Sequence, residues 1–160
     1  MTTENTPAIL IAEDDDDDFF LLSRALRKCL GKAPLYRARD GVETIEYLAG
    51  RDGYSDRRRH PFPGLLVLDL KMPRKNGFDV LEWIRGQKDF QFLLVIVLSS
   101  SSEPEDIERA YGMGANSYLT KPVNFDAYEE MTRSLIRYWL EWNEAPAAVR
   151  QSRVSNSLIS

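Results

Sequence analysis

Short apolar segments, separated by segments with a helical pattern, are the feature that most restricts how this chain can fold. Three of them are strongly apolar: AILIA at 8–12, LLVLDL at 65–70 and FLLVIVL at 92–98. Strands that are buried on both faces of a sheet have this continuous apolar character, whereas strands with one wet face alternate. Two weaker segments, 35–39 and 117–122, complete a set of five predicted strands.

The segments between the predicted strands carry apolar residues at helical spacing. The first helix has its apolar positions at Phe19, Leu22, Leu26, Cys29 and Leu30, and Gly31 and Pro34 end it. Further helices are predicted around 42–49 and 78–84, from Pro104 to about Gly112, and as a long final helix over 125–142. This alternation predicts an α/β fold with a parallel sheet that has helices on both faces.

Composition excludes several classes of protein. Acidic residues outnumber basic ones by 25 to 21, so the basic excess typical of nucleic-acid binding is missing. The longest apolar run, 92–98, is far shorter than the roughly 20 residues of a membrane span, and the first residues do not resemble a signal peptide. A single cysteine, Cys29, and a single histidine, His60, exclude an internal disulfide and a Cys/His zinc cluster. We therefore expect a cytoplasmic protein that binds neither membranes nor nucleic acid.

Polar side chains follow four of the five predicted strands at the point where each strand ends. They are Glu13 and Asp14 after the first strand, Asp69 on the third, Ser99 after the fourth, and Thr120 and Lys121 on the fifth. In doubly wound sheets, ligands bind at the carboxyl ends of the strands. Three carboxylates gathered there repel one another, and a divalent cation removes that repulsion. Oxygen ligands without His or Cys favour Mg²⁺ or a similar hard ion.

The same residues suit phosphoryl chemistry. Mg²⁺ commonly binds phosphate oxygens, and an ammonium and a hydroxyl can bind the others. Asp69 stands alone on the central predicted strand, so it is interpreted as a nucleophile that forms an acyl phosphate. The acids from Asp15 to Asp18 are interpreted as the first turn of a helix, where they cap N–H groups and oppose the dipole, rather than as further metal ligands.

Four motifs in this order, AILIAEDDDDD, LLVLDLKMPRKNG, VIVLSSS and SYLTKP, resemble the receiver domain of two-component response regulators. The resemblance covers about residues 7–143, between tails at 1–6 and 144–160, and we expect the tail from Ala145 to be poorly ordered. It implies a flavodoxin-like (βα)5 sheet with strand order 2-1-3-4-5. Asp69 would accept a phosphoryl group from a histidine of a sensor kinase, with Mg²⁺ as cofactor. The protein would then be a signalling switch and not an enzyme.

The resemblance also implies a role for each residue of the site. Asp14 would bind Mg²⁺ directly and Glu13 mostly through water, and Asp69 and the backbone carbonyl of Lys71 would be further ligands. Ser99 would hydrogen-bond the phosphoryl group, Lys121 would pair with it, and Tyr118 would turn inward as the switch aromatic. The face around the last two helices and the fifth strand would transmit the change. The peptide bond between Lys121 and Pro122 is expected to be cis.

The long loop at 51–64 and the aromatic final helix resemble the single-domain response regulators of bacterial and cyanobacterial phytochromes. Those proteins tend to form homodimers through their last helices, which makes Leu135, Tyr138, Trp139 and Trp142 the candidate dimer residues. The alternative is that this helix covers the protein's own core. A phytochrome kinase is the implied partner, and a downstream phosphotransfer protein is a further candidate. In the loop, Arg57, Arg58 and Arg59 are interpreted as solvated, with an acidic partner as the alternative.

Three other classes fit the sequence less well. Phosphatases of the haloacid dehalogenase type also phosphorylate an aspartate after an apolar strand, but they carry a second acid two positions on, where this chain has Lys71. A degenerate receiver would have lost Asp69 or Lys121, and both are present. A transcription factor needs a DNA-binding domain, and only about 17 residues follow the last predicted helix.

Overall fold

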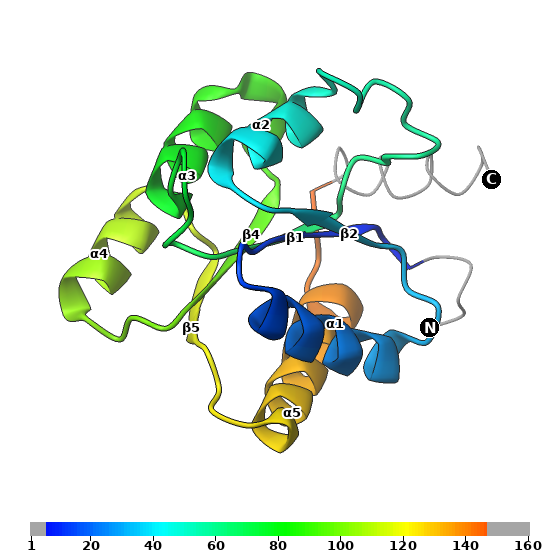
Figure 1. Cartoon of the computed structure of the whole chain (residues 1–160), viewed down its shortest axis with the longest axis vertical. Coiled ribbons are helices and arrows are strands. Elements are labelled where there is room, and N and C mark those ends of the chain that lie inside the picture. Colours follow the sequence, from blue (N-terminus) through cyan, green and yellow to red (C-terminus); the bar gives the residue numbers. More distant parts are fainter. Residues whose placement is uncertain (1–5, 147–160) are drawn as a thin grey trace.

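The structure is a computed structural model that describes residues 6–146. Five parallel strands form one sheet in the order β2-β1-β3-β4-β5, and helices connect them in sequence (Figure 1). The strands are β1 (Ile9–Ala12), β2 (Leu35–Ala38), β3 (Leu65–Leu68), β4 (Leu94–Ser99) and β5 (Ser117–Thr120). The helices are α1 (Asp16–Leu30), α2 (Gly41–Ala49), α3 (Gly77–Gly86), α4 (Pro104–Gly112) and α5 (Phe125–Ile136), with short turns at η2 (Lys88–Phe90) and η3 (Arg137–Trp142). The predicted flavodoxin-like fold and strand order are confirmed.

Alternate side chains of the central strands point to opposite faces of the sheet and pack into two separate cores. In β1, Ile9 and Ile11 pack with α1 and α5, while Leu10 and Ala12 pack with α2 and α3. Figure 1 shows the same division, with α1 and α5 together on one side of the sheet. Because both faces are covered, the strands of the interior read as continuous apolar runs in the sequence.

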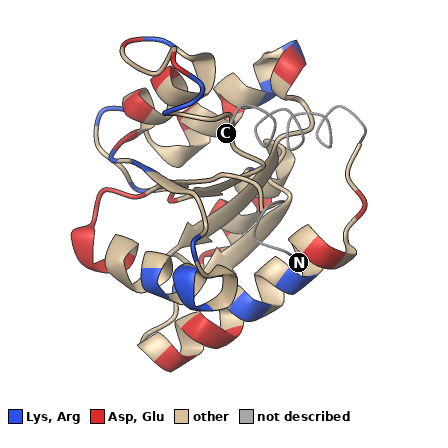
Figure 2. Cartoon of the chain, turned by 90° about the vertical axis from the view of Figure 1, so that its right-hand side faces the viewer, with Lys and Arg blue, Asp and Glu red and all other residues tan. Residues whose placement is uncertain are grey.

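Side-chain caps fix where the helices begin. Asp15 caps α1 by accepting a hydrogen bond from the backbone N–H of Asp18 at 2.8 Å. Asn76 and Asp79 form a reciprocal capping box at the start of α3, with both bonds at 3.0 Å. The prediction that the acidic run begins a helix is therefore confirmed, and Figure 2 shows that run as red ribbon leading into α1.

Several predicted elements differ in detail from the observed ones. Strand β3 stops at Leu68, and the chain bends at Leu70, whose carbonyl accepts a hydrogen bond from Gly77 at the start of α3. Strand β4 begins at Leu94, since Phe92 lies in a turn with its side chain exposed. The final helix spans the predicted 125–142, but its last turn, η3, is π-helical.

The expected cis bond before Pro122 is wrong. No peptide bond within residues 6–146 is cis, so the bond between Lys121 and Pro122 is trans. A trans bond is preferred before proline by about 0.5–1 kcal/mol, and only a close-fitting environment reverses that preference.

The expectation of poor order from Ala145 falls almost wholly on residues outside the described part of the chain.

The four candidate dimer residues of the final helix divide into two pairs. Leu135 is buried in the core between α1, α5 and the sheet, and Trp139 packs against the same core. These two positions therefore fit the alternative that the helix covers its own domain. Tyr138 and Trp142 are 57% and 71% exposed, so they remain available to a second copy.

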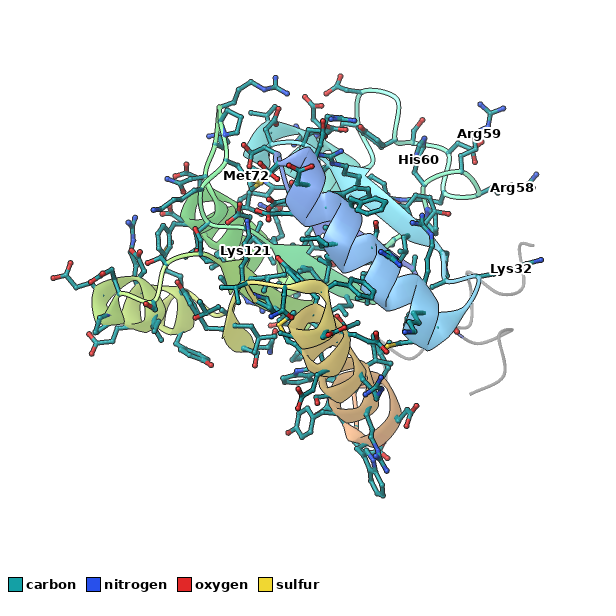
Figure 3. The ribbon with its side chains drawn as sticks, turned by 60° about the horizontal axis from the view of Figure 1, so that its bottom comes forward. Lys32, Arg58, Arg59, His60, Met72 and Lys121 are labelled. Atoms are coloured by element: carbon teal, nitrogen blue, oxygen red, sulfur yellow. The ribbon has the colours of Figure 1, made fainter. Side chains whose placement is uncertain are left out.

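The loop at 51–64 uses its arginines in two ways. Arg57 donates hydrogen bonds to the carbonyls of Tyr47 and Leu48, both at 2.8 Å, and so holds the C-terminal end of α2. Arg58 and Arg59 are exposed and point outward at an edge of the molecule remote from Lys121 (Figure 3).

Within the described residues, none of the helices combines the length and apolar character that crossing a membrane requires.

Candidate functional site

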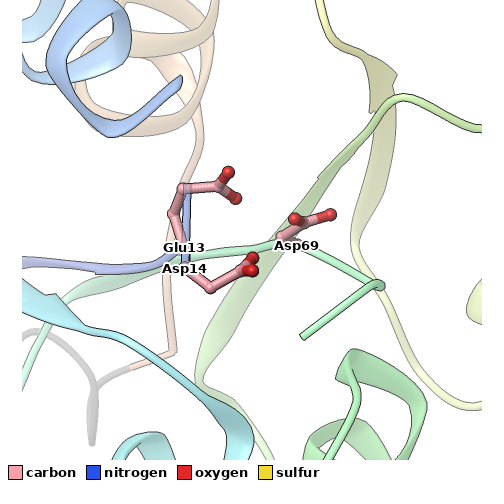
Figure 4. Close-up of side chains that lie close together, drawn as sticks. All are labelled: Glu13, Asp14 and Asp69. Atoms are coloured by element: carbon pink, nitrogen blue, oxygen red, sulfur yellow. The ribbon is translucent and has the colours of Figure 1, made fainter. Parts of the chain in front are cut away.

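Three carboxylates meet at the C-terminal edge of the sheet. Glu13 and Asp14 follow β1, and Asp69 follows the neighbouring strand β3, so the strand order itself brings them together. One oxygen of each lies within 4.8 Å of the others, and Figure 4 shows the three side chains converging. Glu13 and Asp69 are buried, whereas Asp14 is exposed. The site is thus open to solvent at Asp14 and closed behind it.

Two residues outside the cluster hold the backbone of these acids in place. Arg37 of the edge strand β2 donates to the carbonyl oxygens of Glu13 and Asp14, at 3.1 and 3.2 Å, and forms an ion pair with Asp16 at 2.8 Å. Gly77, the first residue of α3, lies so close to the loop after β3 that a Cβ atom there would collide with the carbonyl oxygen of Asp69. Glycine therefore lets α3 begin directly beside the site.

The ammonium of Lys121, just after β5, bonds three carboxylates at once. Its Nζ atom lies 2.8 Å from Asp18 Oδ2, 3.0 Å from Glu13 Oε1 and 3.2 Å from Asp69 Oδ2. The backbone N–H of Lys121 also donates to the carbonyl of Ser99, at 2.8 Å, which fixes where the side chain starts. The lysine, whose side chain is 10% exposed, partly neutralises the buried acids.

Burial and charge shift the protonation of this cluster. Burial raises the pKa of Glu13 to about 9, helped by the hydrogen bond and the charge of the neighbouring Asp69 and opposed by Lys121. Burial alone would lower the pKa of Lys121, but its contacts with Asp18, Asp69 and Glu13 outweigh this and raise it. The ammonium therefore stays charged, and Glu13 shares its site with a second carboxylate that disfavours its ionisation.

A hydroxyl and an aromatic side chain lie on the other side of Asp69, toward α4. Ser99, the buried last residue of β4, accepts a hydrogen bond from the backbone N–H of Ser101 at 3.2 Å. Tyr118 of β5 donates its hydroxyl to the carbonyl of Ser101 at 2.8 Å. Ser101 therefore connects Ser99 and Tyr118 through one short loop. The loop is fixed further by the bond from Ser101 Oγ to Asp106 of α4, at 2.6 Å.

The donor set fits a divalent cation. All three converging side chains offer carboxylate oxygens, and oxygen ligands at a partly open site are the arrangement that Mg²⁺ and Mn²⁺ use. Lys71 follows Asp69 by two residues, and its backbone N–H donates to Asp69 Oδ1 at 3.3 Å. The carbonyl of Lys71 stays a predicted ligand. A cation held by these carboxylates would favour the ionised form of Glu13, against the burial and the neighbouring Asp69 that raise its pKa.

The sequence interpretation missed two residues that contact the site. The sequence predicts Asp18 only as part of the helix start, where its backbone N–H does take part in the cap, but its side chain also bonds Lys121. Its position four residues before Leu22 and eight before Leu26, both buried, gives the signal: at helical spacing Asp18 lies on the inward face of α1. Arg37 has no such signal, because its role depends on the pairing of β2 beside β1.

Residues 9–133 match the family model described as the response regulator receiver domain. The chain belongs to this family. Among relatives of this receiver, the response regulator Rcp1 of Synechocystis is 32% identical over 150 residues, covering 92% of this chain and 100% of that protein. The probable methanogenesis regulatory protein FilR2 of Methanothrix harundinacea is 30% identical over 146 residues, covering 91% of this chain and 92% of that protein.

Solved structures of similar receivers share the fold over nearly their whole length. The phosphorylated cyanobacterial phytochrome response regulator RcpA has a TM-score of 0.82 at 29% identity, over 89% of this chain and 99% of that one. RPA3017, described in red light signalling of R. palustris, has a TM-score of 0.82 at 37% identity, over 88% and 99%. The Mn²⁺-bound form of Rcp1 has a TM-score of 0.79 at 31% identity, over 88% and 99%.

Proposed function

We propose that this receiver accepts a phosphoryl group on Asp69 from a sensor histidine kinase, in a reaction that depends on Mg²⁺. One observation carries the proposal. The carboxylate of Asp69 bonds the ammonium of Lys121 at 3.2 Å and lies within 4.8 Å of two further carboxylates, all at the C-terminal edge of one sheet. A nucleophile, a fixed cation and a metal-binding set are thereby present together.

The chemistry assigned to the chain is a simple displacement. An oxygen of Asp69 attacks the phosphorus, the new O–P bond forms, and the N–P bond to the kinase imidazole breaks. Lys121, held beside Asp69, pairs with the phosphoryl oxygens and stabilises their charge. The side chain of Asp69 is 6% exposed, which limits the access of water to the acyl phosphate. Slow self-hydrolysis would end the signal, so the protein is proposed to be a switch and not an enzyme.

Glu13, Asp14 and Asp69, with the carbonyl of Lys71, are proposed to hold Mg²⁺, with Glu13 acting mostly through water. Bound there, the ion would neutralise the charge shared by the carboxylates and the incoming phosphoryl group. The oxygen-only set supports this assignment, as does the Mn²⁺-bound form of the similar protein Rcp1. Asp14 is the ligand most open to solvent and gives the ion its path of entry.

Ser99 and Tyr118 are proposed to convert the new phosphoryl group into a change of surface. A hydroxyl drawn toward the phosphoryl group would pull on the loop that contains Ser101, and Tyr118 is bonded to that loop. The affected surface is the face formed by α4, β5 and α5. Such a switch is a population shift between two packings, biased by the added charge.

The proposed kinase is a phytochrome, because RcpA is described as a cyanobacterial phytochrome response regulator and RPA3017 is described in red light signalling. FilR2, a similar relative, is described as a probable methanogenesis regulatory protein, so receivers similar to this one are described with different inputs. We further propose a receiver domain over residues 7–143, a homodimer through the exposed end of the final helix, and onward transfer to a phosphotransfer protein. A cytoplasmic location remains the sequence-based prediction.

Intact mass measurement with acetyl phosphate tests the proposal. With Mg²⁺ we expect one phosphoryl adduct that is stable in acid and labile in base, and no adduct with a chelator or in Asp69→Asn. Asp79→Asn, which removes an acid from the start of the next helix α3, is the control and should leave the adduct unchanged. Steady release of phosphate without an adduct would contradict the proposal and favour a phosphatase.

A further inference from the structure

The contact between Asp18 and Lys121 suggests a role for α1 that goes beyond the residues assigned above. Lys121 Nζ is closer to Asp18 Oδ2, at 2.8 Å, than to Asp69 Oδ2, at 3.2 Å. An ammonium has three N–H donors, and Lys121 already has three carboxylate acceptors. Phosphorylation makes Asp69 an uncharged acyl phosphate, so Lys121 exchanges its bond to Asp69 for one to a phosphoryl oxygen. A second bond to the phosphoryl group requires that Lys121 release Glu13 or Asp18.

Solvent exposure determines which bond breaks most easily. The side chain of Glu13 is 5% exposed, so its oxygen would be left buried without the donor that Lys121 supplies. The side chain of Asp18 is 34% exposed, and water can replace the lysine around it. Asp18 is therefore the partner that Lys121 can release at the lowest cost in free energy.

We propose that Asp18 is a positioning residue that holds Lys121 in the unmodified protein and competes with the phosphoryl group for its ammonium. This inference rests on the proposed function of Asp69. The competition would lower the affinity of the site for a phosphoryl group and keep the switch off until phosphotransfer. It would also make the first turn of α1 sensitive to the state of Asp69, because Asp18 lies within that turn.

The test uses beryllofluoride, a phosphoryl mimic that binds without covalent chemistry, titrated by ¹⁹F NMR at saturating Mg²⁺. Asp18→Asn should bind it about two- to fivefold more tightly than the wild type, the range expected for a partly exposed ion pair. Asp17→Asn is the matched control. It removes the same charge from the same turn of α1, at an exposed position for which no bond to Lys121 is found among the described residues. It should bind within twofold of the wild type.

A second pair of variants separates the contact from a general effect of charge. In a Lys121→Gln background the advantage of Asp18→Asn should fall to less than twofold, because the effect acts through the ammonium. Equal affinity of Asp18→Asn and Asp17→Asn, weaker binding by Asp18→Asn, or an advantage that persists without Lys121 would each overturn the inference. Circular dichroism at 222 nm should be the same for all variants, since Asp18 contributes to the cap through its backbone.

The titration also separates this inference from the proposal on which it rests. A wild type that binds no beryllofluoride and forms no adduct with acetyl phosphate would refute phosphoacceptance by Asp69, and this inference with it. A wild type that does both, with Asp18→Asn indistinguishable from Asp17→Asn, would refute only the role of Asp18.

Discussion

Replacing Glu13 by glutamine is expected to stabilise the metal-free protein at neutral pH. The folded protein raises the pKa of Glu13 from 4.5 to about 9, through burial and the neighbouring Asp69, against a smaller effect of Lys121. Because the folded pKa lies above the unfolded one, the folded state binds this proton more tightly. The resulting stability is fully present below pH 4.5 and is lost as the pH rises through about 9.

The size of the effect follows from the same shift. Each pH unit above the unfolded pKa costs about 1.4 kcal/mol of stability, so the cost at pH 7 is about 3 kcal/mol. Glutamine does not bear this cost. Its amide keeps an acceptor for Lys121 and offers a donor toward Asp69. Glu13→Gln should therefore exceed the wild type by about 3 kcal/mol at pH 7 and match it near pH 4.5.

Urea unfolding in a chelator, repeated from pH 4.5 to pH 8, measures this difference. Glu82→Gln, the same change at an exposed position of α3, is the control and should follow the wild type at every pH. A difference that does not change with pH, or a less stable Glu13→Gln at pH 7, would refute the reasoning. In saturating Mg²⁺ the wild type should gain more stability than the variant, because the variant lacks a charged ligand.

Three further predictions concern the metal, the backbone and the loop. Asp14→Asn should raise the dissociation constant for Mg²⁺ at least tenfold, which calorimetric titration measures. Because Asp14 is exposed, the same change should alter the free energy of unfolding in a chelator by less than about 0.5 kcal/mol. An unchanged dissociation constant would show that Asp14 is not a metal ligand. Gly77→Ala should destabilise the fold by more than about 1 kcal/mol and reduce phosphorylation, because the added Cβ would collide with the carbonyl oxygen of Asp69. A variant whose urea midpoint and adduct yield equal those of the wild type would contradict this prediction. Arg57→Ala should cost about 1–3 kcal/mol, because it removes a hydrogen bond from each of two carbonyls at the end of α2, whereas Arg58→Ala should cost less than about 0.5 kcal/mol. Equal midpoints in urea would show that the bonds of Arg57 add nothing.

Most of the fold could be predicted because the sheet is buried on both faces. The runs at 8–12 and 65–70 are apolar for that reason, and Gly50 and Pro104 mark helix ends through their own backbone geometry. The strand ends were less predictable, because apolar residues such as Phe92 and Leu70 also occur in the turns beside a strand. The isomer at Pro122 was not predictable, since it depends on the packing around the bond rather than on the two residues that form it.

The acids of the site could be predicted from their positions after the strands, but their partners could not. Glu13, Asp14 and Asp69 converge because β1 and β3 are neighbours in the sheet. The contact between Asp18 and Lys121 joins residues 103 positions apart and depends on how α1 packs against the end of β5. Trp139 shows the same limit: the sequence places it on the final helix, and only the packing of η3 shows that it faces its own core.

Trapping the phosphorylated carboxylate with borohydride tests the central claim most directly. Borohydride reduces an acyl phosphate to an alcohol, so peptide mass spectrometry would find homoserine at the modified aspartate. The account predicts homoserine at position 69 alone, and only when Mg²⁺ and a phosphodonor are both present. Homoserine at position 14 or 18, or an unreduced chain despite a measured phosphoryl adduct, would contradict it.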